Sequence, residues 1–587
     1  MRPLVGIGVV AAGALAVWLA PGKAPVPGLP DPGILVRSGL PVVRTASEIA
    51  AVLVVGALLA VALRVDIVAL RIAARVTLVW AALALVMVVL TVADSLGQPL
   101  AGVFDVLVPS IGRLPVAVAW LVVAHLAGLV WLGIRLALPP AVLLTTALVG
   151  VAPVALTGHS SAGGDHDIAS DSLMLHVLAM SVWVGGLAAL LVFARRPEGA
   201  ALARRFSSVA LGCWVTVVVT GVVNALLRIS IVDLVTTRYG WLVLAKVAAV
   251  GALGAFGYAH RRRTLDRLDA GRPASLLRLG AVELLLMLLT IGLAVGLGRT
   301  ASPVGERRRL STTEVLIGYD LPGPPSMIGW RLDLVFGTVA VVGAIWYLIR
   351  FRAPTGRMVS WLSGCALLFA ATCSGLGEFE PAVFSAHVSL HVIVGLAVPA
   401  LLAYGYPVEW HPKPTIAAVS AGVLPVLLYV VGGFDEVAGQ HWARLATLAC
   451  SLVAGFALLR LRGIAVYAVA GIWAAVGGAL LMRETALGRG FYGKLDLDWT
   501  RDLLADQRLA GWVALGAAVA LVLFEWRSPL GSVRGEVLRR ASGQPAATID
   551  PAGGGPAAIG RPDRVPDRLL LRPGLQAGQQ GRHRSDP

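Results

Sequence analysis

The sequence predicts an all-α protein, a polytopic transmembrane helix bundle with about 16 spans in two modules. Three observations indicate this class. Hydrophobic residues make up 57% of the 587 residues and charged residues only 14%, which is too apolar for a water-soluble protein. Apolar runs of about 18 to 24 residues, enough to cross a roughly 30 Å hydrocarbon layer, recur along nearly the whole chain. These runs lack the alternation of barrel strands, so they indicate helices.

The elements can be placed in order along the chain. The first apolar run, 3–20, follows only Met1 and Arg2. A signal peptide usually begins with a more basic segment, so a retained helix is favoured over a cleaved signal peptide. The other eight spans of the first module, 1–300, are expected at 48–64, 75–94, 115–135, 139–157, 172–194, 206–228, 240–260 and 279–298. After a polar connector, 301–326, the second module, 327–527, has seven expected spans at 330–350, 359–376, 384–404, 414–432, 443–461, 464–482 and 508–525. The tail, 528–587, is rich in Pro, Gly and Arg and is expected to be a disordered cytoplasmic extension.

The positive charge predicts an orientation. The net charge of +16 is spread over loops and the tail, which favours anionic lipid as a partner and gives no support for nucleic acid. Short cytoplasmic loops collect Lys and Arg. A cytoplasmic N-terminus puts most arginine clusters on inner loops, namely Arg64, Arg71, Arg75, Arg195, Arg196, Arg204, Arg205, Arg261, Arg262, Arg263, Arg350, Arg352, Arg357, Arg460 and Arg462. Arg307 to Arg309 are the main exception. The expected location is the plasma membrane, with multiple passes and both termini cytoplasmic.

Two histidines stand at the outer end of one span in the second module. His387 and His391 lie four residues apart in the stretch SAHVSLHVIVGLAVPALLAYGYP, so both imidazoles share one helix face, with Cβ atoms about 6 Å apart. Placing an ionisable side chain inside a membrane span costs free energy, so such residues are candidates for a functional site. His441 falls in an outer loop of the same module. The alternative is that each histidine only hydrogen-bonds a neighbouring helix.

The first module has its own candidates for metal ligands. His176 and Met180 stack a nitrogen and a soft sulfur on one helix face, a set that suits Cu(I). The alternative is a gap-filling methionine beside a packing pair of glycines, Gly185 and Gly186. In the outer loop before this span, Asp165 and Asp167 beside His159 and His166 are expected to capture a metal loosely, the alternative being a solvated polar loop.

Further polar groups in the first module need partners at membrane depth. Asn224, Lys246 and Glu283 are expected to form a network, either structural or lining a path. His260 falls at the inner end of its span, and no role is predicted for it.

The first module resembles the CopD family of copper-resistance and copper-uptake membrane proteins over about 150–300. The resemblance rests on four segments: His176 to Leu187, Thr220-Gly221 to Arg228, the YGW…K run from Tyr239 to Lys246, and RLGAVE from Arg278 to Glu283. It implies copper movement across, or handling at, the cytoplasmic membrane, with His176 as the residue best carried over.

The second module resembles a different family, the CtaG cytochrome c oxidase assembly proteins, over about 327–527. The resemblance rests on His387-x3-His391 followed by Pro399 and Tyr404-Gly405, on His441, and on DQRLAG from Asp506 to Gly511. It implies delivery of copper for the oxidase, with oxidase subunits or copper chaperones as partners.

The resulting hypothesis is an integral membrane protein, not an enzyme, that handles copper for copper tolerance and oxidase assembly. Copper would be captured by His159, His166 and Asp165, passed to His176 and Met180, and then taken inward or handed to His387, His391 and His441. No Walker-type Gly-rich loop and no transmembrane CPC motif is present in the sequence, so ATP-driven pumping has no support. Two alternatives stay open: a haem b electron-transfer protein with axial ligands such as His176 and His125, and an oxidase-assembly scaffold that binds no metal.

Overall fold

A computed structural model shows a bundle of α-helices, and no strand is assigned among the residues it describes. The described residues are 2–20, 31–63, 68–157, 164–196, 199–260, 262, 274–300, 303, 310–321, 323–326, 328–351, 354–406, 414–459, 461, 464–499 and 502–526. Residues up to Glu525 form one compact unit, which contains the first predicted module and all but the last two residues of the second. The tail predicted over 528–587 lies outside the described residues.

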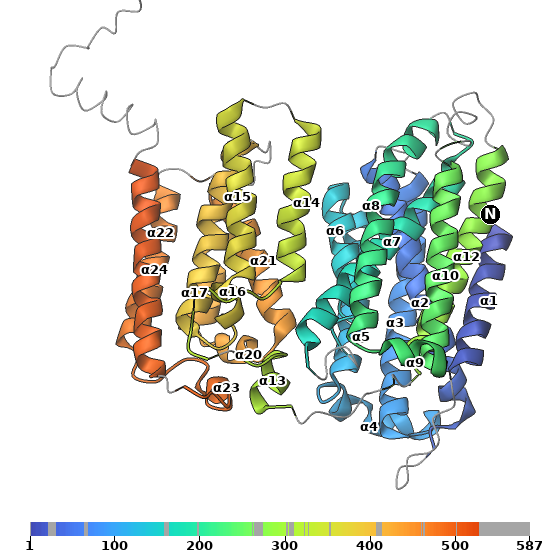
Figure 1. The fold of residues 1–587 in the computed structure, drawn as a ribbon, viewed down its shortest axis with the longest axis horizontal. Coiled ribbons are helices and arrows are strands. Elements are labelled where there is room, and N and C mark those ends of the chain that lie inside the picture. Colours follow the sequence, from blue (N-terminus) through green and yellow to red (C-terminus); the bar gives the residue numbers. More distant parts are fainter. Residues whose placement is uncertain are drawn as a thin grey trace, which may run out of the picture. The chain divides into compact units, whose positions relative to one another are not determined.

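The N-terminal helices run mostly along a common direction (Figure 1). They are α1 (Arg2–Leu19), α2 (Gly33–Ala62), α3 (Val68–Leu96), α4 (Leu100–Ile111), α5 (Pro115–Arg135), α6 (Pro140–Val151), α7 (His166–Phe193), α8 (Gly199–Leu226), α9 (Ile231–Thr236), α10 (Arg238–Ala259) and α12 (Ala274–Gly298). The main packing partners are α2 with α3 and α7, α3 with α5, α7 with α8, and α1 with α12.

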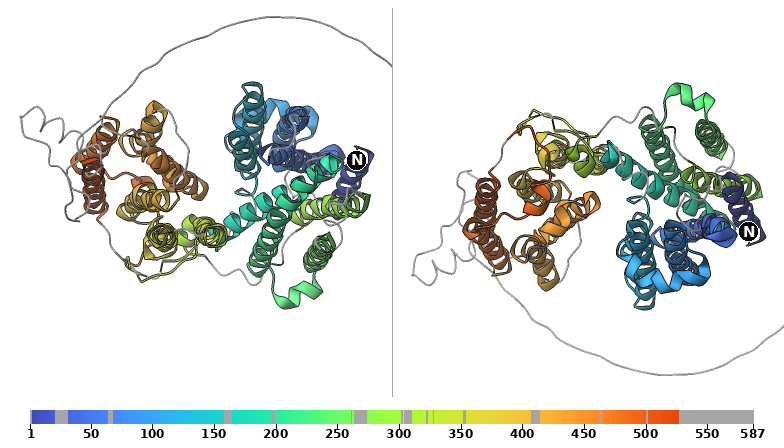
Figure 2. Two further views of the ribbon diagram at one scale, coloured as in Figure 1. Left: turned by 90° about the horizontal axis from the view of Figure 1, so that it is seen from above. Right: turned by 90° about the horizontal axis from the view of Figure 1, so that it is seen from below.

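The C-terminal helices form a second group around their own apolar cores (Figure 2). They are α13 (Thr312–Ile317), α14 (Leu334–Arg350), α15 (Thr355–Cys373), α16 (Gly375–Phe379), α17 (Phe384–Val392), α18 (Val398–Gly405), α19 (Pro414–Pro425), α20 (Phe434–Ala438), α21 (His441–Leu458), α22 (Ile464–Met482), α23 (Arg489–Tyr492) and α24 (Leu503–Trp526). Two π-helical turns, η3 (Ile393–Ala397) and η4 (Val426–Val430), interrupt the series. Between the two groups, α7 contacts α14.

The all-α transmembrane class is confirmed, but the count of 16 spans is not. Among the described residues, 12 helices are long and apolar enough to cross a membrane. The four other predicted spans fall on shorter apolar helices, which are α1, α6, α14 and α19 with η4. In α6 the cause is visible in the sequence, because Pro153 has no N–H to continue the helical hydrogen bonds, and the helix ends at Val151 although Ala152 keeps helical backbone angles. A further short apolar helix, α4, was not predicted.

Glycines allow the closest contact inside the N-terminal group. Gly56 of α2 and Gly185 of α7 face each other, and a Cβ atom on either residue would overlap the backbone of the opposite helix. A Cβ atom on Gly186 would instead overlap the Phe206 ring of α8. The packing interpretation of Gly185 and Gly186 is therefore confirmed by their surroundings.

The span that contains the histidine pair is a helix broken by one π-helical turn. Pro399 cannot donate a hydrogen bond to the carbonyl of Gly395, and the Val398 N–H donates to the Ile393 carbonyl five residues back. The freed Gly395 carbonyl lies against Gly455 of α21, where a Cβ atom would overlap it. The turn thus begins two residues after His391 and is packed directly on α21.

Replacing Gly185 by Ala is expected to lower stability by about 1–3 kcal/mol, because the added methyl group forces α2 away from α7. Gly128→Ala in α5 is the matched control, since no atom lies within 4 Å of the position of its Cβ atom. That control should be neutral or stabilising by up to about 1 kcal/mol. Thermal unfolding in detergent measures both, and equal midpoints for the two variants would contradict the close approach.

Candidate functional site

The acidic start of α7 is tied to the C-terminal half by one arginine. Arg331 donates from Nε and Nη2 to the two carboxylate oxygens of Asp167, at 2.9 and 2.7 Å, and from Nη2 to Asp165 at 3.1 Å. The guanidinium also stacks on the Tyr319 ring, 3.6 Å from its centroid. A two-pronged arginine–carboxylate pair fixes orientation as well as charge. It therefore sets the position of α7 relative to the segment that precedes α14.

A second connection lies one turn further along α7. His441, the first residue of α21, approaches the carboxylate of Asp171, with 2.8 Å between Nε2 and Oδ1. Asp333 caps α14 by accepting a hydrogen bond from the Phe336 N–H at 2.7 Å. Burial, followed by the charge of Asp171, raises the pKa of Asp333 to about 7. Asp333 therefore holds a proton for part of the time at neutral pH.

Glu380 joins a cation to the first histidine of the predicted pair. It lies between α16 and α17, where one carboxylate oxygen is 3.2 Å from Nε of Arg444 and the other is 2.5 Å from Nδ1 of His387. Burial alone would raise the pKa of Glu380, but the Arg444 charge and the His387 hydrogen bond lower it to about 2. Glu380 is therefore a carboxylate at neutral pH, and it accepts the Nδ1–H of His387.

His391 is fixed in the same tautomer by a different partner. Its Nδ1 lies 2.8 Å from Ser451 Oγ on α21, and that hydroxyl donates its own proton to the Thr447 carbonyl at 3.1 Å. With the Ser451 proton on Thr447, Nδ1 of His391 is the donor in this contact, which leaves Nε2 with the lone pair. In His387 the Nε2 atom is buried and has no hydrogen-bond partner. The two rings are close, with centroids 4.4 Å apart.

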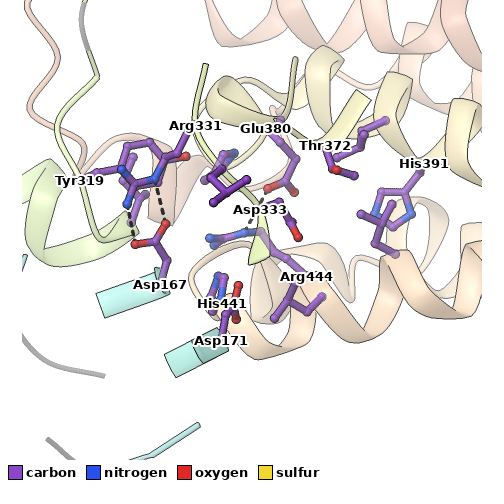
Figure 3. A pocket seen from close by; sticks show the side chains of 17 residues that line it. Asp167, Asp171, Tyr319, Arg331, Asp333, Thr372, Glu380, His391, His441 and Arg444 are labelled. Atoms are coloured by element: carbon purple, nitrogen blue, oxygen red, sulfur yellow. Dashed lines mark hydrogen bonds and ion pairs between the residues drawn. The ribbon is translucent and has the colours of Figure 1, made fainter. Parts of the chain in front are cut away.

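These groups surround a cavity of about 70 Å³ at the junction of the two halves. Figure 3 shows the acidic residues of α7 on one side and Glu380, Arg444 and His391 on the other. The polar lining residues are Asp167, Asp171, Tyr319, Arg331, Asp333, Thr372, Glu380, His391, His441 and Arg444. His387 contacts His391 but does not line the cavity. The site is polar and large enough for water or a small ion.

The structure brings part of the predicted ligand set to this cavity. His391 and His441 line it, and His387 contacts His391. Asp165 is engaged by Arg331, and His166 is buried at the start of α7. His159 lies outside the described residues. Sequence reasoning missed Arg331, Glu380 and Arg444, because each acts through partners that are distant in the sequence or outside the span.

His176 and Met180 lie elsewhere on α7. Nδ1 of His176 is 3.0 Å from the Thr220 hydroxyl of α8, and Met180 packs against an apolar core of the N-terminal half. Asn224 donates to Ser172 and to the Thr220 carbonyl, and Glu283 pairs with His260, so hydrogen bonds do not join Asn224 and Glu283 into the expected network. Within the described ranges, no group of three or more His, Cys, Asp or Glu is arranged to hold a metal ion.

Glu380→Gln is expected to destabilise the protein by about 3 kcal/mol at pH 7, because it leaves Arg444 buried without its countercharge. The folded-state pKa of Glu380 is lowered, so its contribution is fully present above the unfolded value of about 4.5 and is lost as the pH falls toward 2. The difference in thermal midpoint between wild type and variant should shrink over that window. Glu436→Gln, an exposed change in α20, is the control, and a difference that stays constant with pH would contradict the assignment.

Two family models match the chain. Residues 200–297, which cover α8 to α12, match Copper resistance protein D. Residues 341–412, which include the histidine pair, match the cytochrome c oxidase caa3 assembly factor (Caa3_CtaG). The first match lies in the middle of the chain and begins after the segment that contains His176 and Met180.

Longer similarity is found to mycobacterial proteins. Uncharacterized proteins of Mycobacterium bovis and Mycobacterium tuberculosis are each 27% identical over 563 residues, which is 83% of this chain and 83% of theirs. An uncharacterized protein of Mycobacterium leprae is 27% identical over 568 residues, 84% of each chain. No solved structure matches. The chain is thus a multi-pass, all-α membrane protein that carries a segment similar to Copper resistance protein D and one similar to the caa3 oxidase assembly factor.

Proposed function

We propose that this protein handles copper as cargo at the junction of its two halves and so supports copper tolerance and cytochrome c oxidase assembly. In this proposal it resides in the plasma membrane with both termini cytoplasmic and acts without enzymatic turnover. Copper would move along or across the membrane and be given to oxidase subunits or copper chaperones. The two family matches support a copper-related or oxidase-assembly role in general terms.

The observation that carries the proposal is the arrangement of His387 and His391. Histidines that bind metals usually donate their second ring N–H to a carboxylate, carbonyl or other acceptor, which fixes the tautomer and raises the basicity of the ligating nitrogen. Glu380 accepts from His387 and Ser451 accepts from His391. Both Nε2 lone pairs are left for a ligand, and that of His387 is buried without any partner. Imidazole nitrogen is a suitable ligand for copper.

The charges near the pair suit a cation that binds and leaves. Arg444 balances the charge of Glu380, while Asp167 and Asp171 across the cavity are balanced by Arg331 and His441. The cavity is therefore polar without a large excess of negative charge. A site of two imidazoles holds copper less tightly than a saturated set of ligands, which suits transfer better than storage.

Wild-type protein purified in detergent and loaded with copper should bind about one copper ion per chain. The His387→Ala/His391→Ala double variant should not bind this ion. The reason is that both lone-pair nitrogens of the pair are removed. Elemental analysis of the gel-filtered protein measures the copper. The control is His125→Ala, a change of an exposed histidine on α5, which should leave binding unchanged.

Two outcomes of that measurement would overturn the assignment. Copper retained by the double variant would place the site elsewhere in the chain. Wild-type protein without copper but with a haem Soret band would favour electron transfer, and protein without either would favour a scaffold.

Ser451→Ala should weaken copper binding by about ten-fold, because His391 loses the acceptor that fixes its tautomer. The matched control is Ser360→Ala, since that hydroxyl also joins two helices by donating to the Leu401 carbonyl. Competition with a chelator of known affinity gives the copper dissociation constant of each variant. Equal weakening in both variants would indicate a general loss of packing and would count against a role of Ser451 at the histidine pair.

A further inference from the structure

A larger, mostly apolar cavity of about 310 Å³ lies within the N-terminal half, among α7, α8, α10 and α12. Its walls include the aromatic rings of Trp183, Phe206 and Trp214. This volume and lining are typical of sites for small organic molecules. The cavity lies beside the C-terminal part of α7 and is separate from the acidic start of that helix, where the histidine site is found.

The rim of this cavity is exposed along membrane-spanning helices. Leu211 on α8 and Tyr258 on α10 line it and are 47% and 58% exposed. In the most apolar stretch of α8, and likewise in that of α10, only 11% of the residues are buried. Exposed apolar residues on transmembrane helices face lipid, so a ligand would arrive from the bilayer. Such a ligand must be lipid-soluble.

One part of this apolar cavity is polar, and one buried nitrogen there has no hydrogen-bond partner. His260 and Glu283 both line it and pair with each other, with 3.0 Å between Nε2 and Oε2, while the buried Nδ1 of His260 has no hydrogen-bond partner. The side chain of Glu283 is only 4% exposed. Leaving a buried polar atom unsatisfied costs about 1–3 kcal/mol. A ligand with a polar group that hydrogen-bonds His260 would remove this cost.

We propose that the cavity binds a lipid-soluble molecule of the quinone and hydroquinone class. Its ring would lie between the aromatic walls, a ring hydroxyl would donate to Glu283 or a ring carbonyl would accept from His260, and its apolar chain would leave over Leu211 toward lipid. Aromatic rings gain from offset or edge contacts with tryptophan and phenylalanine. A phospholipid acyl chain fits the apolar part but offers no hydrogen bond to His260 or Glu283.

The test uses full-length protein in detergent, without oxygen, and isothermal titration calorimetry with hexyl-hydroquinone. The matched apolar probe is hexylbenzene, which has the same chain and ring without hydroxyl groups. Wild-type protein should bind the hydroquinone at least ten-fold more tightly than hexylbenzene. His260→Phe and Glu283→Leu should each weaken hydroquinone binding about ten-fold and leave hexylbenzene binding unchanged, because only the polar contacts are removed.

A second variant keeps the proposal testable if a change in the polar pair prevents folding. Ala210→Trp adds a large side chain at the cavity wall and does not alter His260 or Glu283; it should abolish binding of both probes. Gel filtration checks that each variant is folded. The proposal is overturned if wild-type protein does not distinguish the two probes, or if hydroquinone binding persists in Ala210→Trp.

Discussion

The junction of the two halves depends on the compensation of buried charge. α7 carries acidic residues at its start, and these can be buried only because Arg331 and His441 reach them from the C-terminal half. Removing one partner of a buried pair leaves an uncompensated charge, which costs far more than the pair contributes. The same pairs define the walls of the polar cavity. The geometry of the candidate site and the association of α7 with the second half therefore have a common physical cause.

The histidine pair shows how far local spacing can predict a site. Two residues four apart on a helix must share a face, so the proximity of His387 and His391 follows from the sequence alone. Their tautomers do not follow from it. Glu380 precedes the span and Ser451 belongs to α21, and only the fold brings these acceptors to the two Nδ1 atoms.

The class of fold was also predictable, because the length and apolar character of the runs are local properties. The boundaries of the spans were less predictable, since a proline such as Pro153 ends α6 inside an apolar run. Contacts across long separations were not predictable. Arg331 and Asp167 are 164 residues apart, and His260, to which the sequence gives no role, meets Glu283 only through the packing of α10 on α12. Spacing rules contain no information about such pairs.

The order of the residues around the polar cavity has a consequence for the proposed copper transfer. His391 lines the cavity, whereas His387 does not line it and is fully buried. An ion entering from the cavity would therefore meet His391 first. The π-helical turn η3 starts just after His391 and is packed against α21 at Gly455, so the backbone there is constrained. The ring of His391 is tied to the same helix by the hydroxyl of Ser451, so the position of the first nitrogen depends on the packing of this span on α21.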